Sequence, residues 1–442
     1  MADPALQNLQ KIDHIVVLMQ ENRSFDHLLG YLALTPRAHP VDGLQPAMKN
    51  THAGVDYHVH HLASTRLGHD QNPCHTGACV RQQMAGSMGG FVDSYAATHP
   101  ADPHPDVVMG YYTGADLPVF DQLAAEYAVC DRWFSSVPGA TWPNRLYAAS
   151  GGAAGSLDNR KVPLYDVATF PRHLDAAKVG WRWYYHDVPT LRLMDERYRF
   201  DVERFATFSR RQWLMPKTFL DAAAAGELPP VAWIDPNFTD QDVVGPTGAN
   251  DDHPPSDVHD GQDLVLRIYH ALTTARTWPK TLLVIVYDEH GGLFDHVSPP
   301  ATGETGRFAR YGPRVPALVV SPFVERGTMS SALYDHTSLI RTILERFCRS
   351  RTGAIPDLGP RVAQANHLGG LLTLPKPRPA PPATALEPLI AAAARYRSET
   401  FGEGLRTAAA VRAATPELDE FQQGLVTAME RLARRQASAA RR

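Results

Sequence analysis

The chain has 442 residues, of which 44% are hydrophobic and 20% charged, an ordinary balance for a globular protein with ample material for a core. Its 43 Lys and Arg against 47 Asp and Glu give a net charge of −4, so no nucleic-acid partner is expected. No apolar run approaches the ~18 residues that span a bilayer, and MADPALQNLQKIDH lacks the features of a signal peptide. We therefore expect a cytoplasmic protein or an exported one that lacks its leader; oligomeric state is not encoded in any visible pattern.

Short apolar runs alternate with helical patterns. Residues 12–18 (IDHIVVL) are β-branched and typical of a buried strand, and residues 281–287 are almost all apolar, as in a strand covered on both faces. A third apolar stretch covers residues 315–321, and residues 257–272 have the three- and four-residue spacing of a helix. The alternation predicts an α/β sheet with helices on both faces and its chemistry at the carboxyl ends of strands.

Three segments lie outside this pattern. Residues 35–90 are rich in His, Gly, Asn and Gln and weakly periodic, which predicts a long excursion over the active face. Residues 235–256, dense in Asp, Asn and Pro, predict a second loop. A proline-rich connector and a helical tail then follow the main body. We therefore divide the chain into a catalytic domain, residues 1–374, and a connector with a helical tail, residues 375–442.

The four cysteines are too few for a disulfide scaffold. Cys74 and Cys79 bound the segment CHTGAC, which contains His75. No second cysteine pair follows at the spacing of a zinc site. Plain thiols are therefore the favoured interpretation, with a local disulfide or a metal clip as the alternatives.

A polar cluster follows the first predicted strand. Glu21 and Asn22 stand side by side and offer two oxygen ligands to a hard cation. The competing interpretation is a helix N-cap, for which Ser24 or Asn22 is suited.

A second cluster, DEHGG, follows residues 281–287 directly. The adjacent carboxylates of Asp288 and Glu289 repel each other unless a cation or a proton lies between them. The Gly-Gly pair permits close backbone approach to a ligand. The competing interpretation is a charged turn with a glycine hinge.

Thr141 lies in VPGATWPNR, ahead of a segment typical of a helix start. A hydroxyl at a helix N-terminus gains from the positive dipole end and from free N–H groups, which also favour phosphate. Taken alone, a plain N-cap is the stronger interpretation. His253 in NDDHPP and His69 could contact phosphate or protonate a leaving group, although most of the 20 histidines must serve other purposes.

Taken together, IVVLMQENRSFDHLLGYL, ATWPNRLYAASG, NDDHPPSDV, YDEHGGLFDHVSPP and GPRVPALVVSP resemble the signature segments of the phosphoesterase family. That family contains bacterial phospholipases C, plant non-specific phospholipases C and certain bacterial acid phosphatases. The segments occur in order over residues 12–347, which leaves the tail uncovered. The resemblance implies an alkaline-phosphatase-like, three-layer α/β/α sandwich with one metal ion beside the nucleophile and a phospho-enzyme intermediate.

The resemblance also implies roles for individual residues. Thr141 would be the nucleophile, and one divalent metal ion would be held by Glu21, Asn22, Thr141, Asp288 and Glu289. Oxygen ligands favour Ca²⁺, Mg²⁺ or Mn²⁺, while nearby histidines admit Zn²⁺ or Fe.

The substrate phosphate would contact Asn22, His69, His253 and His290. His253 is also the expected general acid. The segment GHDQNPCHTGAC around His69 departs from the family pattern, which weakens that transfer.

The predicted function is a metal-dependent phosphoric ester hydrolase of phospholipase C type, acting on phospholipid at a membrane surface or on related phosphodiesters. The alternatives are an acid phosphatase acting on monoesters and an inactive phosphate- or lipid-binding relative. Trp133, Phe134 and Trp142, near the expected nucleophile, could line an apolar or choline-binding pocket or belong to the core.

Overall fold

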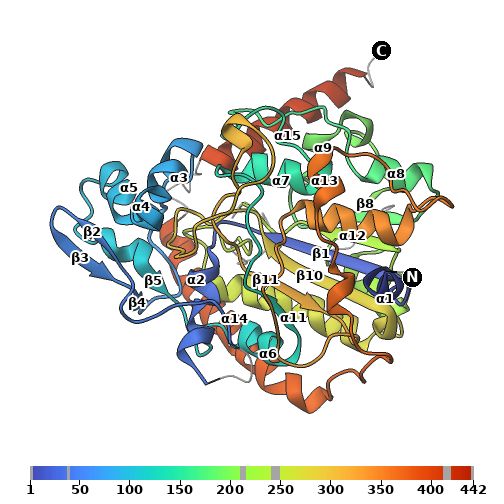
Figure 1. Ribbon diagram of the computed structural model, residues 1–442, viewed down its shortest axis with the longest axis horizontal. Helices are drawn as coiled ribbons and strands as arrows, with labels where there is room; N and C mark the ends of the chain where they lie inside the picture. The colour runs from blue at the N-terminus through green and yellow to red at the C-terminus, as the bar shows by residue number, and fades with distance from the viewer. Residues whose placement is uncertain (1–2, 37–39, 210–215, 240–248, 412–419, 440–442) are drawn as a thin grey trace.

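A computed structural model describes residues 3–36, 40–209, 216–239, 249–411 and 420–439. One eight-stranded sheet crosses the middle of the molecule, in the order β12-β6-β11-β10-β1-β9-β7-β8 (Figure 1). All neighbouring strands are parallel except β11, which runs antiparallel to β10 and β6. The strands are β1 (His14–Gln20), β6 (Ala128–Cys130), β7 (Trp181–Tyr185), β8 (Phe205–Thr207), β9 (Val231–Ile234), β10 (Thr281–Tyr287), β11 (Ala317–Val320) and β12 (Thr328–Ser330).

The two central strands determine where the chemistry lies. All seven residues of β10 are buried, as expected for a strand covered on both faces, and its bounds are those predicted from the sequence. β1 begins two residues later than predicted, and its last residue, Gln20, pairs in parallel with the last residue of β10, Tyr287. The polar segments that follow Gln20 and Tyr287 therefore leave the sheet side by side.

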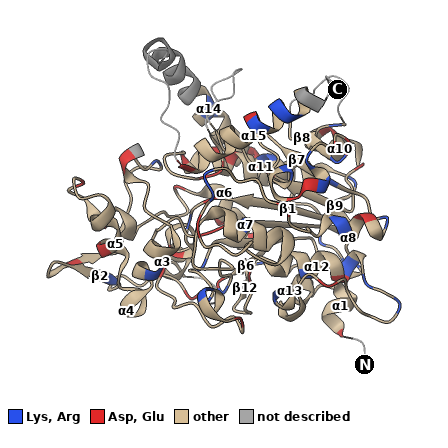
Figure 2. Ribbon diagram, turned by 90° about the horizontal axis from the view of Figure 1, so that it is seen from above, with Lys and Arg blue, Asp and Glu red and all other residues tan. Residues whose placement is uncertain are grey.

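Helices cover both faces of the sheet, which confirms the predicted α/β/α sandwich. Figure 2 shows β1 and β9, which contain no charged residue, between the two helical layers. One layer contains α1 (Pro4–Leu9), α7 (Thr141–Ser150), α8 (Pro171–Ala176), α12 (Thr337–Phe347) and α13 (Pro360–Gln364). The other contains α6 (Pro118–Glu126), α10 (Phe219–Ala225), α11 (Val258–Thr274) and α14 (Ala383–Val411).

The predicted irregular excursion is a folded lobe, seen at the left of Figure 1. It has an apolar cluster of its own around Phe91, Val92 and Tyr95, and Leu293 and Phe294 join this cluster from the segment after β10. The sequence did not reveal the lobe because its elements are too short for a clear period. They are β2 (Lys49–His52), β3 (Val55–His58), β4 (His60–His61), β5 (Gly110–Tyr111), α3 (Gly77–Gln83), α4 (Ala85–Met88) and α5 (Phe91–Thr98).

The predicted helical tail is present as α14 and α15 (Glu420–Ala439). α15 packs Phe421 and Leu425 against Trp142 and Leu146 of α7 in one buried cluster. The tail therefore covers the helix that begins at Thr141, while the domain boundary at residue 374 stays a prediction. Residues 240–248 of the second predicted loop lie outside the described residues.

The remaining helices are short. No described helix is long and apolar enough to cross a membrane. The helices not yet introduced are α2 (Phe25–Leu28), α9 (Leu191–Met194) and 3-10 helices at Gly30–Leu34, His69–Gln71, Pro105–Met109, Glu196–Tyr198, Trp278–Lys280, Gly306–Phe308 and Leu368–Leu371.

Candidate active site

The ends of β1 and β10 bring the two predicted acidic segments together. The backbone N–H of Asp288 donates to the carbonyl of Gln20 over 3.0 Å, so the ladder continues one residue beyond the end of β10. The backbone N–H of Glu21 donates to the carbonyl of Asp251 over 2.8 Å, which adds a third carboxylate from the second predicted loop. The side chains of all three acids are fully buried.

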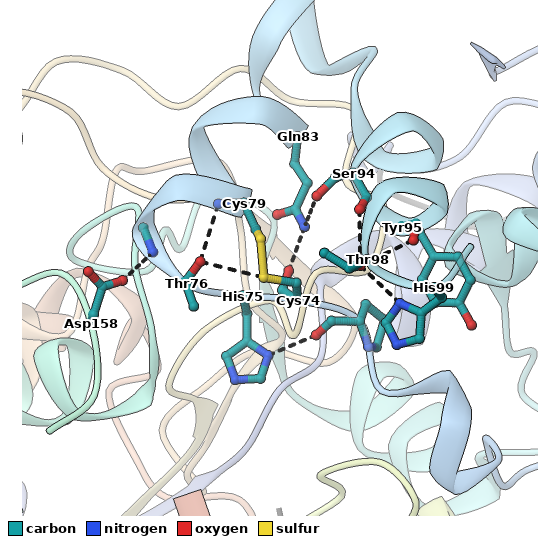
Figure 3. Close-up of a disulfide and its surroundings, with 12 residues drawn as sticks. Cys74, His75, Thr76, Cys79, Gln83, Ser94, Tyr95, Thr98, His99 and Asp158 are labelled. Atoms are coloured by element: carbon teal, nitrogen blue, oxygen red, sulfur yellow. Dashed lines mark hydrogen bonds between the residues drawn. A yellow bond between two sulfur atoms is a disulfide. The ribbon is translucent and has the colours of Figure 1, made fainter. Parts of the chain in front are cut away.

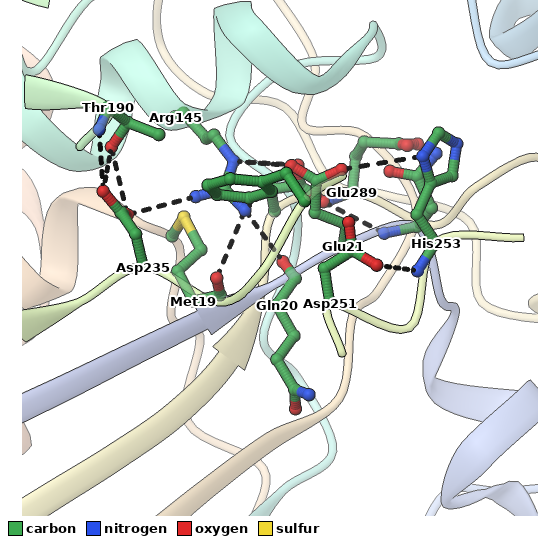
Figure 4. A network of polar contacts seen from close by, with 12 residues as sticks. Met19, Gln20, Glu21, Arg145, Thr190, Asp235, Asp251, His253 and Glu289 are labelled. Carbon is green, nitrogen blue, oxygen red and sulfur yellow. Dashed lines mark hydrogen bonds and ion pairs between the residues drawn. The ribbon is translucent and has the colours of Figure 1, made fainter. Parts of the chain in front are cut away.

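Arg145 lies beside the carboxylates of Glu21 and Asp235, which Figure 4 labels together with it. Its Nε lies 3.1 Å from Oε1 of Glu21 and 3.3 Å from Oδ2 of Asp288, and its Nη1 lies 4.0 Å from Oδ1 of Asp235. Burial alone would lower the pKa of Arg145, but the surrounding carboxylates raise it above its ordinary value. The guanidinium is therefore a permanent buried cation that partly neutralises the acidic segments.

Thr141 is the first residue of α7, and Ala140 occupies the N-cap position. The N-cap interpretation of Thr141 is therefore wrong. Its side chain is fully buried, and its Oγ1 has no hydrogen-bond partner among the described residues. Thr141 stands one helical turn before Arg145 on the same face of α7. The contacts of Arg145 thus hold the start of α7 against the strand ends.

Asn22 adopts a left-handed backbone conformation with φ of 57°, which Asn tolerates better than most residues. Its backbone N–H donates to Oδ1 of Asp288 over 3.1 Å, and its side-chain Oδ1 has no hydrogen-bond partner in the described part of the chain. The N-cap of α2 is Ser24, whose Oγ accepts from the N–H of His27. The side chain of Asn22 is therefore not the N-cap of α2 and is available to bind a ligand. Gly291, at φ of 65°, leaves room for it, since a Cβ there would lie 2.2 Å from the Asn22 carbonyl oxygen.

Asp288 and Glu289, the two adjacent acids after β10, repel each other as the sequence predicted. Burial raises the pKa of Glu289 to about 8, an effect that Asp288 reinforces and His75 opposes. Burial also raises the pKa of Asp288, while Arg145 opposes that shift. Within the described residues, Oε1 of Glu289 has no hydrogen-bond partner. Both acids would therefore gain from a cation between them.

His253 lies against the acidic cluster. Its Nδ1 is 3.7 Å from Oε2 of Glu21, and Nδ2 of Asn72 is 3.3 Å from its Nε2. Glu21, Asp251 and His253 each offer a ligand atom, and these atoms lie within 4.8 Å of one another. Asp251 belongs to the NDDHPP segment but was not among the predicted metal ligands. The pairing of its carbonyl with the N–H of Glu21 brings it to the site.

His290 is fully buried and faces the lobe. Its Nε2 lies 2.8 Å from Oε1 of Gln83 and its Nδ1 lies 3.2 Å from Oε2 of Glu289. Burial lowers its pKa to about 3, so the ring is neutral. These contacts orient Glu289, and the predicted phosphate contact of His290 stays a prediction. The same holds for His69, which begins the 3-10 helix His69–Gln71 but whose side chain lies outside the described residues.

His75 reaches the site although it was not a predicted site residue. Its ring lies 3.5 Å from Nδ2 of Asn22, and its ring centroid is 5.8 Å from that of His253. Cys74 and Cys79, on either side of it, form a disulfide, so the expectation of plain thiols is wrong. α3 begins at Gly77 and turns the chain so that the two Cα atoms lie 5.9 Å apart, a distance that sequence spacing does not fix.

A cavity of 240 Å³ opens onto the site. His75 and His253 line it together with Ala140, which immediately precedes Thr141, and Phe421 of the tail. Trp133, Phe134 and Trp142 are instead buried to 1% exposure or less, so they are core residues and not the lining of a choline pocket. Asn72, Pro73, Cys74, Thr76, Asp158, Asn159 and Glu420 complete the lining.

The site as a whole fits a divalent cation. The site contains more buried carboxylates than the single positive charge of Arg145 can neutralise. Buried charges of one sign are costly unless they are paired or bind a metal ion. Three buried oxygens that have no hydrogen-bond partner among the described residues are hard donors suited to such an ion: Oδ1 of Asn22, Oγ1 of Thr141 and Oε1 of Glu289. The carboxylates are those of Glu21, Asp251, Asp288 and Glu289.

Two solved structures resemble this fold at low identity. A protein of the alkaline phosphatase superfamily from Vibrio parahaemolyticus is 10% identical with a TM-score of 0.35, over 82% of this chain and 78% of its own. The sulfatase PsFucS1 from Pseudoalteromonas sp. is 11% identical with a TM-score of 0.39, over 85% of this chain and 76% of its own.

Sequence relatives are more similar. Non-specific phospholipase C6 of Arabidopsis thaliana is 35% identical over 374 residues, which cover 76% of this chain and 68% of that protein. Phospholipase C A of Mycobacterium tuberculosis (strain ATCC 25618 / H37Rv) is 30% identical over 407 residues, which cover 78% of this chain and 75% of that protein. The model of the phosphoesterase family matches residues 12–348. The resemblance drawn from the signature segments is thus confirmed, and the chain belongs to the phosphoesterase family of phosphoric ester hydrolases.

Proposed function

We propose that this hydrolase is a metal-dependent phosphodiesterase of phospholipase C type with Thr141 as its nucleophile. The observation that carries the proposal is the buried Oγ1 of Thr141, which has no hydrogen-bond partner in the described residues and lies at the N-terminus of α7. The contacts of Arg145 with Glu21 and Asp288 hold this helix end beside the acidic cluster. A hydroxyl in that position needs an activating charge to become a nucleophile, and the cluster is suited to bind one.

The metal ion would be held by Glu21, Asn22, Thr141, Asp288 and Glu289, with Asp251 as a further donor. When bound, it would lower the pKa of the Thr141 hydroxyl and polarise a phosphoryl oxygen. A site made mainly of oxygen donors favours Mg²⁺, Mn²⁺ or Ca²⁺, and a nitrogen ligand from a nearby histidine would admit Zn²⁺ or Fe.

The reaction proceeds in two displacements. Oγ1 of Thr141 loses its proton to solvent and bonds to phosphorus, while the bond from phosphorus to the alcohol oxygen breaks and protonated His253 gives its proton to that oxygen. Water then attacks phosphorus and passes a proton to His253. The bond to Thr141 breaks, and its oxygen regains a proton from solvent. The side chains of Asn22 and His75 orient the phosphoryl oxygens, since positioning supplies much of the rate in phosphoryl transfer.

The substrate class is proposed from the relatives, which are named as phospholipases C. The cavity supports it, because the apolar ring of Phe421 and the polar rings of His75 and His253 line it together, a mixed lining that suits a lipid phosphodiester. The test compares hydrolysis of phosphatidylcholine vesicles, p-nitrophenyl phosphorylcholine and p-nitrophenyl phosphate across pH. Faster turnover of the diesters is expected. Turnover of the monoester alone would establish an acid phosphatase, and no turnover by the metal-loaded protein would leave a binding relative.

Metal dependence has its own test. Removal of bound metal with a chelator should abolish turnover, and return of one divalent ion per chain should restore it. Elemental analysis must accompany the assay. Full activity in protein that contains no metal would overturn the assignment of the acidic cluster as a metal site.

A further inference from the structure

We infer that the Cys74–Cys79 disulfide is a positioning element of the active site, which holds His75 against Asn22, and that reduction of this bond lowers activity. The inference rests on the proposed function of the site. It concerns two cysteines that take no part in the chemistry itself.

The disulfide closes a short loop with His75 inside it (Figure 3). The two cysteines are separated by five positions in sequence, and His75 follows the first of them directly. Nδ1 of His75 lies 3.0 Å from the carbonyl oxygen of Pro73, a contact that turns the ring back across the loop. Because so few residues lie between the sulfur atoms, the bond restricts the backbone of His75 itself.

The free edge of the His75 ring faces the site. Asn22 Nδ2 lies 3.5 Å from the ring, and the His253 ring stands edge-on to it. A shift of the loop would therefore move a group that faces both Asn22 and His253.

The loop is fixed to the segment after β10 by contacts that do not depend on the sulfur atoms. Nε2 of Gln83 donates to the carbonyl of Cys74 over 2.7 Å, while Oε1 of Gln83 lies 2.8 Å from Nε2 of His290. Gly292 makes this approach possible, since a Cβ there would lie 2.8 Å from the Cys74 carbonyl oxygen. The N–H of Gly77 donates to Oδ1 of Asp158 over 2.7 Å on the other side.

These contacts predict what reduction does. The loop keeps its anchors at Gln83 and Asp158, so the fold persists, but the peptide that carries His75 gains freedom. Both cysteines are partly exposed, so a reductant in solution can reach them. A disulfide that closes so short a loop restricts the unfolded chain less than one that closes a long loop. Its effect is therefore on the placement of His75.

The first experiment compares the oxidised protein with protein reduced by a phosphine, and both with Cys74→Ser/Cys79→Ser. Reduction and the double substitution should each lower kcat/KM by up to about a hundredfold, the loss that follows a small misplacement of a catalytic group. The melting temperature should change little. Cys348→Ser, which alters a free cysteine far from the loop in sequence, should keep both the activity and the response to reductant.

The second experiment tests whether the effect acts through His75. In a His75→Ala background, reduction should produce no further loss. A full further loss there, or an unchanged kcat/KM after complete reduction of the wild-type protein, would overturn the inference. Affinity of the metal-loaded protein for inorganic phosphate, measured by calorimetry, gives a readout that does not require turnover. It should fall on reduction in the wild type and not in His75→Ala. Inactivity of the oxidised wild type would instead count against the proposed function.

Discussion

Nε of Arg145 donates to Oε1 of Glu21 over 3.1 Å, and both side chains are fully buried. The pair joins α7 to the end of β1, and so joins the element that carries Thr141 to the element that carries Asn22. A buried ion pair of this kind adds little net stability over an apolar pair, but the loss of one partner leaves an uncompensated charge.

Substitution Arg145→Ala should therefore be severe. It leaves Glu21 and Asp288 buried without their cation, and we expect a loss of about 3–5 kcal/mol in the free energy of unfolding together with loss of turnover. Urea unfolding of metal-free protein measures the first. Arg434→Ala is the matched control, since the exposed pair of Arg434 with Glu430 should be worth at most about 1 kcal/mol. Equal stability of the two variants would show that Arg145 does not hold the site together.

Thr141→Ala should separate catalysis from folding. Oγ1 has no hydrogen-bond partner in the described residues, so its removal should shift the melting temperature little. Turnover should fall by more than about a thousandfold, as for removal of a nucleophile, while Thr141→Ser should retain measurable activity. Turnover of Thr141→Ala near that of the wild type would remove Thr141 from the mechanism.

Phe421 connects the tail to the site. Its ring packs 5.8 Å from those of Trp142 and Phe238 and 6.2 Å from that of His253. Because the side chain is buried, Phe421→Ala should cost about 3–5 kcal/mol, measured by urea unfolding. Lipid diester turnover should also fall, because Phe421 lines the cavity. Leu333→Ala, at an exposed position, should change neither quantity. Unchanged activity of Phe421→Ala would mean that the tail has only a structural role.

His296 makes stability depend on pH. Its Nδ1 lies 2.6 Å from Oδ2 of Asp26 and its Nε2 lies 2.9 Å from Oδ1 of Asp42. Burial alone would lower the pKa of His296, but Asp26 and Asp295 outweigh burial and the charge of Arg314, and raise it to about 9. A raised pKa stabilises the fold fully below the unfolded value of 6.5, and this contribution is lost as the pH rises through about 9.

The measurement is the free energy of unfolding between pH 6 and pH 10 for the wild type and for His296→Gln. The difference between the two proteins should shrink as the pH rises through this range. A difference that stays constant would show that His296 carries no proton linkage.

The sequence by itself determined the elements whose signal is local. β10 was predicted with its observed bounds because a continuous apolar run needs no partner to be recognised. Thr141 was expected near a helix start because the residues that follow it are typical of one. The signature segments also sufficed for the family. These features depend on residues that are neighbours in the chain.

Only the tertiary structure decided how those segments meet. Arg145 contacts a carboxylate 124 positions away in sequence, and the N–H of Glu21 pairs with the carbonyl of Asp251. His75 reaches Asn22 through a disulfide loop whose closure depends on where α3 begins. Such contacts follow from strand register and helix packing, which bring distant residues within a few ångströms. Local residue patterns do not encode those distances. For that reason the sequence predicted candidate metal ligands but not the residues that hold those candidates in place.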